Sequence, residues 1–293
     1  MCGILGILGQ TSVADRLLQG LSRLEYRGYD SAGIAVLTKC GPALRRSIGK
    51  LASLRDEMAR DPVDGAVGIG HTRWATHGAP TLENAHPHRS GKVTVVHNGI
   101  IENYAEIRKD LEADGWVFQS ETDTEAVVGL CDRFLRQGSS PKDAVCQTLN
   151  KLEGAYALCF MFDDTPDQMI VARLGSPLVI GYGDPSLDGR FEMFVGSDAV
   201  ALAPFTSRIS YLEDGDMAVL SGGGVLIEGK DGVDAVREIK EVETGELSVD
   251  KGPFQHFMAK EIHEQPESLA RALSGLVDHH SLTLKPFLQE VDF

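Results

Sequence analysis

The chain has 293 residues, of which 42% are hydrophobic, and its 28 Lys and Arg against 43 Asp and Glu leave a net charge of −15. This negative charge repels phosphate backbones and anionic lipids, which argues against nucleic-acid or membrane-surface binding. No apolar run approaches the roughly 18 residues of a membrane helix, and the start lacks the basic and long apolar regions of a secretory signal. The length suits one large domain, or one domain with an additional fragment.

The cysteines indicate a reducing environment. They are odd in number, widely spaced and without a Cys-x-x-Cys pair: Cys2, Cys40, Cys131, Cys146 and Cys159. This pattern predicts a cytoplasmic protein without a disulfide framework. Because Cys131, Cys146 and Cys159 lie in apolar stretches, they are predicted to be small core residues.

Both helices and short strands are predicted in the first half of the chain. Residues 12–26 are expected to form a helix with a capping box at Ser12 and Asp15 and one apolar stripe. Short apolar runs at 33–38, 67–71 and 93–97 predict strands. A helix follows at 102–113.

Two more helices are predicted before the pattern changes. Thr122 and Glu125 form a second capping box, for a helix that stops at Gly138. Ser140-Pro141 begins the next helix, with proline at its first position.

From residue 155 onward the pattern is that of short strands separated by Gly, Pro and Asp turns, at 155–162, 169–173, 178–182, 193–196, 209–212 and 217–220. Helix pairs alternating with many short strands predict an α+β layered domain with largely antiparallel sheets. Apolar density falls after about residue 235. The sequence therefore predicts a domain over 2–235, an acidic linker over 236–257 and a helical connector over 258–293.

The start of the chain carries the first chemical signal. Removal of Met1 makes Cys2 the N-terminal residue, with its α-amino group beside its own thiol. The thiolate is the nucleophilic form, and an α-amine with a pKa of about 7.7–8.0 can take the thiol's proton. The alternative is that Cys2 is an ordinary residue of a first strand containing Ile4 and Ile7.

Four further stretches contain clustered polar and glycine residues. They are Leu24–Gly33 (LEYRGYDSAG), His71–Gly78 (HTRWATHG), His97–Asn103 (HNGIIEN) and Ser120–Glu125 (SETDTE). Together with the Cys2-Gly3-Ile4 start, they resemble the glutaminase half of the glucosamine-6-phosphate synthases. These are class II glutamine amidotransferases of the N-terminal nucleophile hydrolase superfamily. The resemblance runs from Cys2 to about Leu220 and resumes at 258–266.

The resemblance implies a fold, a substrate and a partner domain. The fold is a four-layer αββα sandwich, and the substrate is L-glutamine, hydrolysed to glutamate and ammonia without a cofactor. The ammonia serves glucosamine 6-phosphate synthesis from fructose 6-phosphate, in a sugar-phosphate isomerase half that lies beyond this chain. The full-length enzymes of the family are expected to be homo-oligomers.

Glutamine hydrolysis needs a nucleophile, an oxyanion hole and a clamp for the charged ends of the substrate. The resemblance places the catalytic roles at Cys2, Asn98 and Gly99, the last two supplying N–H donors to the oxyanion. From the residues alone, Asn-Gly also fits a tight turn after the strand at 93–97.

Substrate binding is expected from seven residues: Arg27, Gly28, Arg73, Trp74, Thr76, His77 and Asp123. A guanidinium such as that of Arg73 suits the glutamine carboxylate, and Asp123 suits its ammonium. The resemblance also implies that residues 73–81 form a mobile lid.

Three other functions remain open. Five histidines between 71 and 97 suggest a metal hydrolase, although zinc needs three or four ligands and His86-Pro87-His88 supplies two; the resemblance implies a site without metal. A non-catalytic domain that binds glutamine is the second alternative. The third is an acylase acting on another amide, against which the charges of Arg73 and Asp123 argue.

Overall fold

The computed structural model describes residues 2–26, 28–75, 78–185 and 189–242, and shorter pieces at 254, 258–260, 262–266, 269, 277–278 and 283–284. The chain divides into two compact units, 1–248 and 249–293. In the second unit, residues 258–260, 262–266 and 269 are helical, and β16 (Val277–Asp278) pairs with β17 (Thr283–Leu284). Whether a linker and a connector divide at the predicted positions stays a prediction.

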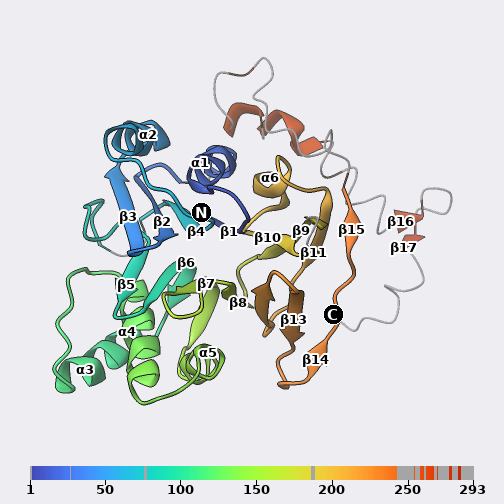
Figure 1. Ribbon diagram of the computed structural model, residues 1–293. Helices are drawn as coiled ribbons and strands as arrows, with labels where there is room; N and C mark the ends of the chain where they lie inside the picture. The colour runs from blue at the N-terminus through green and yellow to red at the C-terminus, as the bar shows by residue number, and fades with distance from the viewer. Residues whose placement is uncertain are drawn as a thin grey trace. The chain divides into compact units, whose positions relative to one another are not determined.

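The first unit contains two antiparallel sheets (Figure 1). The first has eight strands in the order β15-β11-β9-β10-β1-β4-β2-β3. Their bounds are β1 (Gly3–Leu8), β2 (Ser31–Thr38), β3 (Gly41–Ile48), β4 (Val67–Arg73), β9 (Val179–Pro185), β10 (Phe191–Gly196), β11 (Arg208–Tyr211) and β15 (Lys240–Glu241).

The second sheet has seven strands in the order β14-β13-β12-β8-β7-β6-β5. Their bounds are β5 (His88–Ser90), β6 (Val93–Ile101), β7 (Gly154–Phe162), β8 (Gln168–Leu174), β12 (Met217–Ser221), β13 (Gly224–Glu228) and β14 (Asp234–Ala235).

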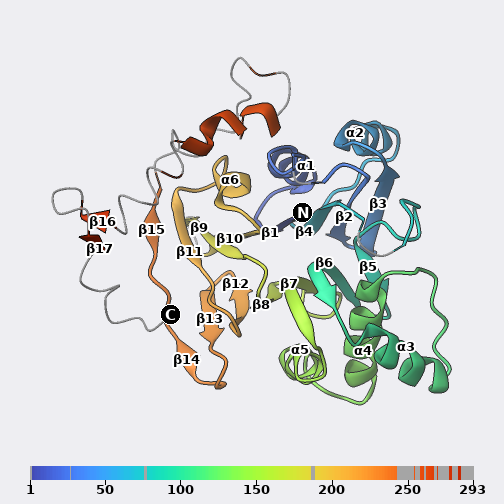
Figure 2. The ribbon, with the colours of Figure 1, turned by 180° about the vertical axis from the view of Figure 1, so that it is seen from behind.

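Helices cover the outer face of each sheet. The eight-stranded sheet carries α1 (Ala14–Ser22), α2 (Leu51–Arg60) and α6 (Ala199–Leu202), and the seven-stranded sheet carries α3 (Tyr104–Ala113), α4 (Asp123–Arg136) and α5 (Pro141–Leu149). The view from behind shows the same separation of the two helix groups (Figure 2).

Strand β1 illustrates how the layers are specified. Alternate side chains of a strand point to opposite faces. Leu5 and Ile7 therefore pack with α1 and its neighbours, whereas Ile4 and Leu8 pack between the two sheets. All four are buried. The predicted α+β fold with antiparallel sheets in a four-layer αββα sandwich is confirmed.

Two capping predictions need correction. Helix α1 begins at Ala14 and has no side-chain cap, so the box predicted at Ser12 is wrong. The backbone N–H of Val13 donates to Gly65 O at 2.9 Å, and this contact fixes the entry to the helix. At α4, Thr122 does accept from Glu125 N, but the Glu125 carboxylate accepts from the backbone of residues 119 and 120 instead of returning to Thr122.

The five cysteines are free thiols. Cys131 and Cys159 are buried as predicted, but Cys146 is exposed, because α5 turns Ala144, Val145 and Thr148 toward the core. In the described part of the chain, no helix combines the length and apolar character needed to cross a membrane.

Candidate active site

Cys2 directly precedes β1, and β1 runs between β10 and β4 of the eight-stranded sheet (Figure 1). Gly3 pairs with Thr72 of β4, which brings Cys2 beside the residues that follow this strand. The backbone N–H of Trp74 donates to Cys2 Sγ at 3.2 Å, and the thiol donates to Trp74 O at 3.4 Å. Burial raises the pKa of the Cys2 thiol, and the Trp74 N–H partly opposes this effect. The resting thiol therefore needs a base to become nucleophilic.

Asn98 and Gly99 lie within β6, paired with Ala157 and Tyr156 of β7. The alternative reading of this pair as a turn is therefore wrong. Gly99 has a φ of +127°, and a Cβ there would lie 2.0 Å from Ala155 O, so only glycine fits this strand position.

The side chain of Asn98 joins the two sheets. Its Nδ2 donates to Cys2 O at 3.1 Å, and its Oδ1 lies 3.0 Å from Nε2 of His71 on β4. The amide is therefore held from both ends beside the thiol-bearing residue.

Two charged side chains approach the site from other elements. Arg73, at the end of β4, is 4% exposed, and its guanidinium donates to Gly78 O and Ala79 O at 3.3 Å each. Asp123, the first residue of α4, is also buried and accepts from the Ile101 N–H at 2.9 Å. A cation and an anion thus line the same cavity as Cys2.

These groups surround one small cavity of about 20 Å³. Its lining is Cys2, Arg73, Trp74, His86, His97, Gly99, Thr122, Asp123 and Thr124. A cavity of this size has room for about one water molecule, so the site is closed in this conformation.

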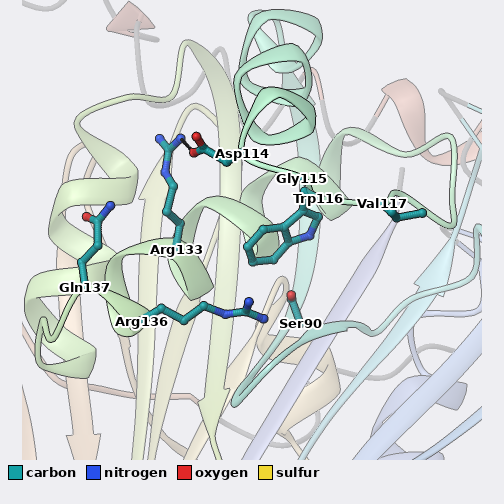
Figure 3. A pocket seen from close by; sticks show the side chains of 8 residues that line it. All are labelled: Ser90, Asp114, Gly115, Trp116, Val117, Arg133, Arg136 and Gln137. Atoms are coloured by element: carbon teal, nitrogen blue, oxygen red, sulfur yellow. Dashed lines mark hydrogen bonds and ion pairs between the residues drawn. The ribbon is translucent and has the colours of Figure 1, made fainter.

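A larger groove of about 470 Å³ lies elsewhere, between α3, α4 and β5 (Figure 3). Its cations are already neutralised, since Arg133 pairs with Asp114 at 3.1 Å and Arg136 pairs with Asp132 at 2.9 Å. Arg136 also lies over the Trp116 ring. The Ser90 hydroxyl in this groove donates to the Asp132 carboxylate, which Arg136 already neutralises and which is therefore a poor base. The candidate active site is the smaller cavity at Cys2.

The structure places some predicted residues near this cavity and leaves others undescribed. Arg27, Thr76 and His77 lie outside the described residues. Gly28 packs against the backbone of Arg73, where a Cβ would come within 2.8 Å. Trp74 is 47% exposed, with its ring edge-on to Tyr29.

Sequence reasoning did not assign the buried residues that support the site. His97 Nδ1 lies 3.0 Å from Thr124 Oγ1, and His88 Nε2 lies 3.0 Å from Thr122 Oγ1. Two histidines therefore form hydrogen bonds to side chains at the start of α4. His86 stacks on His71 with ring centroids 4.2 Å apart. Among the described residues, no group of three or more His, Cys, Asp or Glu is arranged to hold a metal ion. The density of histidines between 71 and 97 was the available signal for this cluster.

Comparison with known proteins also indicates a glutamine amidotransferase. The sequence profile of the glutamine amidotransferase domain matches residues 73–202. A glutamine–fructose-6-phosphate aminotransferase (isomerizing) from Bradyrhizobium diazoefficiens is 54% identical over 279 residues, which are 95% of this chain and 45% of that protein. Residues 73–202 of the chain therefore carry a glutamine amidotransferase domain.

Further similarities fit this amidotransferase assignment. The protein of the same name from Mesorhizobium japonicum is 50% identical over 293 residues, 100% of this chain and 47% of that one. The structure of a glutamine phosphoribosylpyrophosphate amidotransferase from B. subtilis superposes with a TM-score of 0.64 at 26% identity, over 85% of this chain and 50% of that one. The amidotransferase chain spans about half the length of the curated relatives that it matches.

Proposed function

We propose that this amidotransferase hydrolyses L-glutamine to glutamate and ammonia, with Cys2 as the nucleophile. The observation that carries the proposal is that Cys2, Arg73 of β4 and Asp123 of α4 line one cavity, while Asn98 of β6 donates a hydrogen bond to Cys2 O. Hydrolysis of a free amino acid with a side-chain amide requires these groups: a thiol to attack the amide, an N–H donor for the oxyanion, a cation for the carboxylate and an anion for the ammonium.

The first step is attack of the Cys2 thiolate on the side-chain carbonyl carbon of glutamine. With Met1 removed, the α-amine of Cys2 accepts the thiol proton and later delivers it to the departing nitrogen. Ammonia leaves and a thioester remains. Water then attacks the thioester, the amine takes a proton from it, and glutamate and the free thiol are released.

The oxyanion of the tetrahedral intermediate receives two N–H donors. Nδ2 of Asn98 carries two hydrogens and uses one toward Cys2 O, which leaves the second for the oxyanion. The Gly99 N–H is the other proposed donor. Its place in the lining of the cavity beside Cys2 supports this role.

The charged ends of glutamine are assigned to Arg73 and Asp123. In the closed site, Arg73 donates to the carbonyls of Gly78 and Ala79. We infer that the substrate carboxylate replaces these carbonyls, since a guanidinium binds a carboxylate more strongly than a neutral oxygen. Residues 73–81 would then move to admit glutamine, as expected of a lid. The other predicted substrate-binding residues keep their proposed roles in shaping this substrate site: Gly28, Arg27, Trp74, Thr76 and His77.

The released ammonia is proposed to serve a second reaction. The relatives are named for fructose 6-phosphate and are about twice as long as this chain. We propose that residues 2–235 form the glutaminase domain and that 236–257 and 258–293 lead toward a sugar-phosphate isomerase half, within a homo-oligomer. Five free thiols support a reducing, cytoplasmic setting.

The test is ammonia release from glutamine by the purified protein, with intact mass analysis before and after a glutamine-like electrophile. The expected result is loss of Met1, a single adduct on Cys2 and loss of ammonia release. Cys40→Ala is the matched control, because it removes an exposed thiol and should leave labelling unchanged. Failure to release ammonia with Met1 removed would contradict the proposal and favour a glutamine-binding domain.

A further inference from the structure

His71 contacts Asn98, the proposed oxyanion donor, and has no role in the steps above. It sits on β4 with 0% exposure. Its Nε2 lies 2.9 Å from His97 O and 3.0 Å from Asn98 Oδ1. A backbone carbonyl oxygen can only accept, so Nε2 carries the hydrogen and donates to both oxygens.

The orientation of the Asn98 amide follows from its two neighbours. Cys2 O can only accept, so the amide nitrogen faces Cys2 and the amide oxygen faces His71. Turning the amide over would bring Asn98 Oδ1 against Cys2 O and its NH2 against the Nε2–H of His71. Both contacts would be repulsive, and the two neighbours therefore select the same orientation.

The protonation state of His71 suits this task. Burial lowers its pKa to about 3, with His97 and Arg73 adding to the effect and the bonds to Asn98 and His97 O opposing it. The ring is therefore neutral near pH 7. A ring with this pKa, whose Nε2–H is committed to two acceptors, is a poor base for the Cys2 thiol.

We propose that His71 is a positioning residue: its Nε2–H holds Asn98 Oδ1 so that the Asn98 amide presents an N–H to the oxyanion. The proposal rests on the glutaminase function proposed for Cys2 and Asn98. Because the oxyanion exists only after attack, the effect of His71 belongs to kcat and not to glutamine binding.

Two amide substitutions make a matched test. In His71→Gln, the amide nitrogen can reach the position of Nε2, whereas in His71→Asn it stops one methylene short. We expect H71Q to keep kcat within about threefold of the wild type and H71N to lower it roughly 10- to 100-fold, both with little change in KM. Equal losses in both variants, or a rise in KM instead, would overturn the proposal.

A double substitution separates positioning from general structural support. Once Asn98→Ala has removed the amide, H71N should lower kcat no further, because the two residues act as one unit. If the loss of kcat in the double variant were the product of the losses in the two single variants, His71 would act independently of Asn98. If N98A alone keeps the wild-type rate, the oxyanion role of Asn98 fails, and with it the role of His71, while ammonia release still supports the Cys2 chemistry.

A measurement on the unmodified protein guards against variants that do not fold. Nitrogen NMR of protein labelled in histidine distinguishes the two ring tautomers. The His71 signals should show a protonated Nε2, a bare Nδ1 and no titration between pH 5 and 8. A protonated Nδ1, or titration in this range, would overturn the proposal without any substitution.

Discussion

Asn98 Nδ2 lies 3.1 Å from Cys2 O, and this hydrogen bond joins the two sheets at the proposed active site. Cys2 precedes β1 of the eight-stranded sheet, and Asn98 belongs to β6 of the seven-stranded sheet. The proposed nucleophile and the proposed oxyanion donor are therefore brought together by the packing of sheet on sheet. The site depends on the whole sandwich and not on one local motif.

The first prediction concerns the nucleophile. Cys2→Ala should abolish ammonia release and keep glutamine affinity within a few-fold, because the thiol forms the bond while Arg73 and Asp123 hold the charged ends. Calorimetric titration with glutamine measures the second property. Measurable ammonia release by the variant would contradict the assignment of Cys2.

The second prediction concerns the oxyanion donor. Asn98→Ala should lower kcat roughly 10²–10³-fold, the usual effect of losing one such donor, with little change in KM. Asn150→Ala, at an exposed asparagine after α5, is the control and should leave both constants unchanged. A raised KM with normal kcat would indicate that Asn98 binds the substrate instead.

The regular elements could be predicted because their apolar residues repeat with a clear period. The strand expected at 169–173 is β8, Gln168–Leu174, and the helix expected from Pro141 is α5. The edge strand β3 and the following α2 were not predicted. Most of β3 is only half-buried, so it lacks the alternation that marks a strand with one face in the core.

The sequence named Cys2, Arg73, Gly99 and Asp123, which the structure brings to one cavity, but it did not predict the geometry of the candidate site. The motifs around Cys2, Arg73 and Asn98 carried the family resemblance. The contact between His71 and Asn98 depends on how two sheets pack, and no local pattern encodes such a contact. The hydrogen bond from Trp74 N to the thiol is likewise a backbone contact that any residue at 74 except proline would make.

The third prediction concerns the glycine of β6. Gly99→Ala should destabilise the protein by about 3 kcal/mol or more, since the new Cβ would meet Ala155 O in addition to the strain of a positive φ. Gly115→Ala is the matched control: its φ is +88° but nothing lies within 4 Å, so a cost of about 1–2 kcal/mol is expected. Urea unfolding compares them, and equal costs would refute the clash.

The fourth prediction concerns stability at mildly acidic pH. Burial lowers the pKa of His71 and of His88 to about 3 and that of His86 well below its usual value. Below pH 6.5 the unfolded chain binds protons that the folded chain excludes. The stability due to these neutral histidines is fully present above pH 6.5 and is lost progressively toward pH 3, at up to about 1.4 kcal/mol per pH unit for each.

Urea unfolding between pH 7.5 and 5 measures this slope. His88→Gln is the informative variant, because an amide can keep the hydrogen bond to Thr122 but does not titrate. Its stability should fall less steeply with acid than that of the wild type. An unchanged slope would show that His88 is not buried in its neutral form.

The last prediction concerns the carboxylate clamp. Arg73 lies at the end of β4 with its guanidinium fork directed at two carbonyl oxygens, those of Gly78 and Ala79. Arg73→Lys keeps the charge but replaces two parallel donors with one compact ammonium group. We expect KM for glutamine to rise roughly 10- to 100-fold, with kcat within a few-fold of the wild type.

A second substrate makes this prediction specific to the carboxylate. Glutamine with its α-carboxyl group converted to an amide should bind weakly to the wild type, and Arg73→Lys should weaken it little further, because the guanidinium has no carboxylate to pair with. Arg55→Lys, at an exposed position of α2, is the control for a general effect of losing an arginine. If Arg73→Lys raised KM equally for both substrates, the guanidinium would be shaping the closed site through Gly78 and Ala79 and not binding the carboxylate.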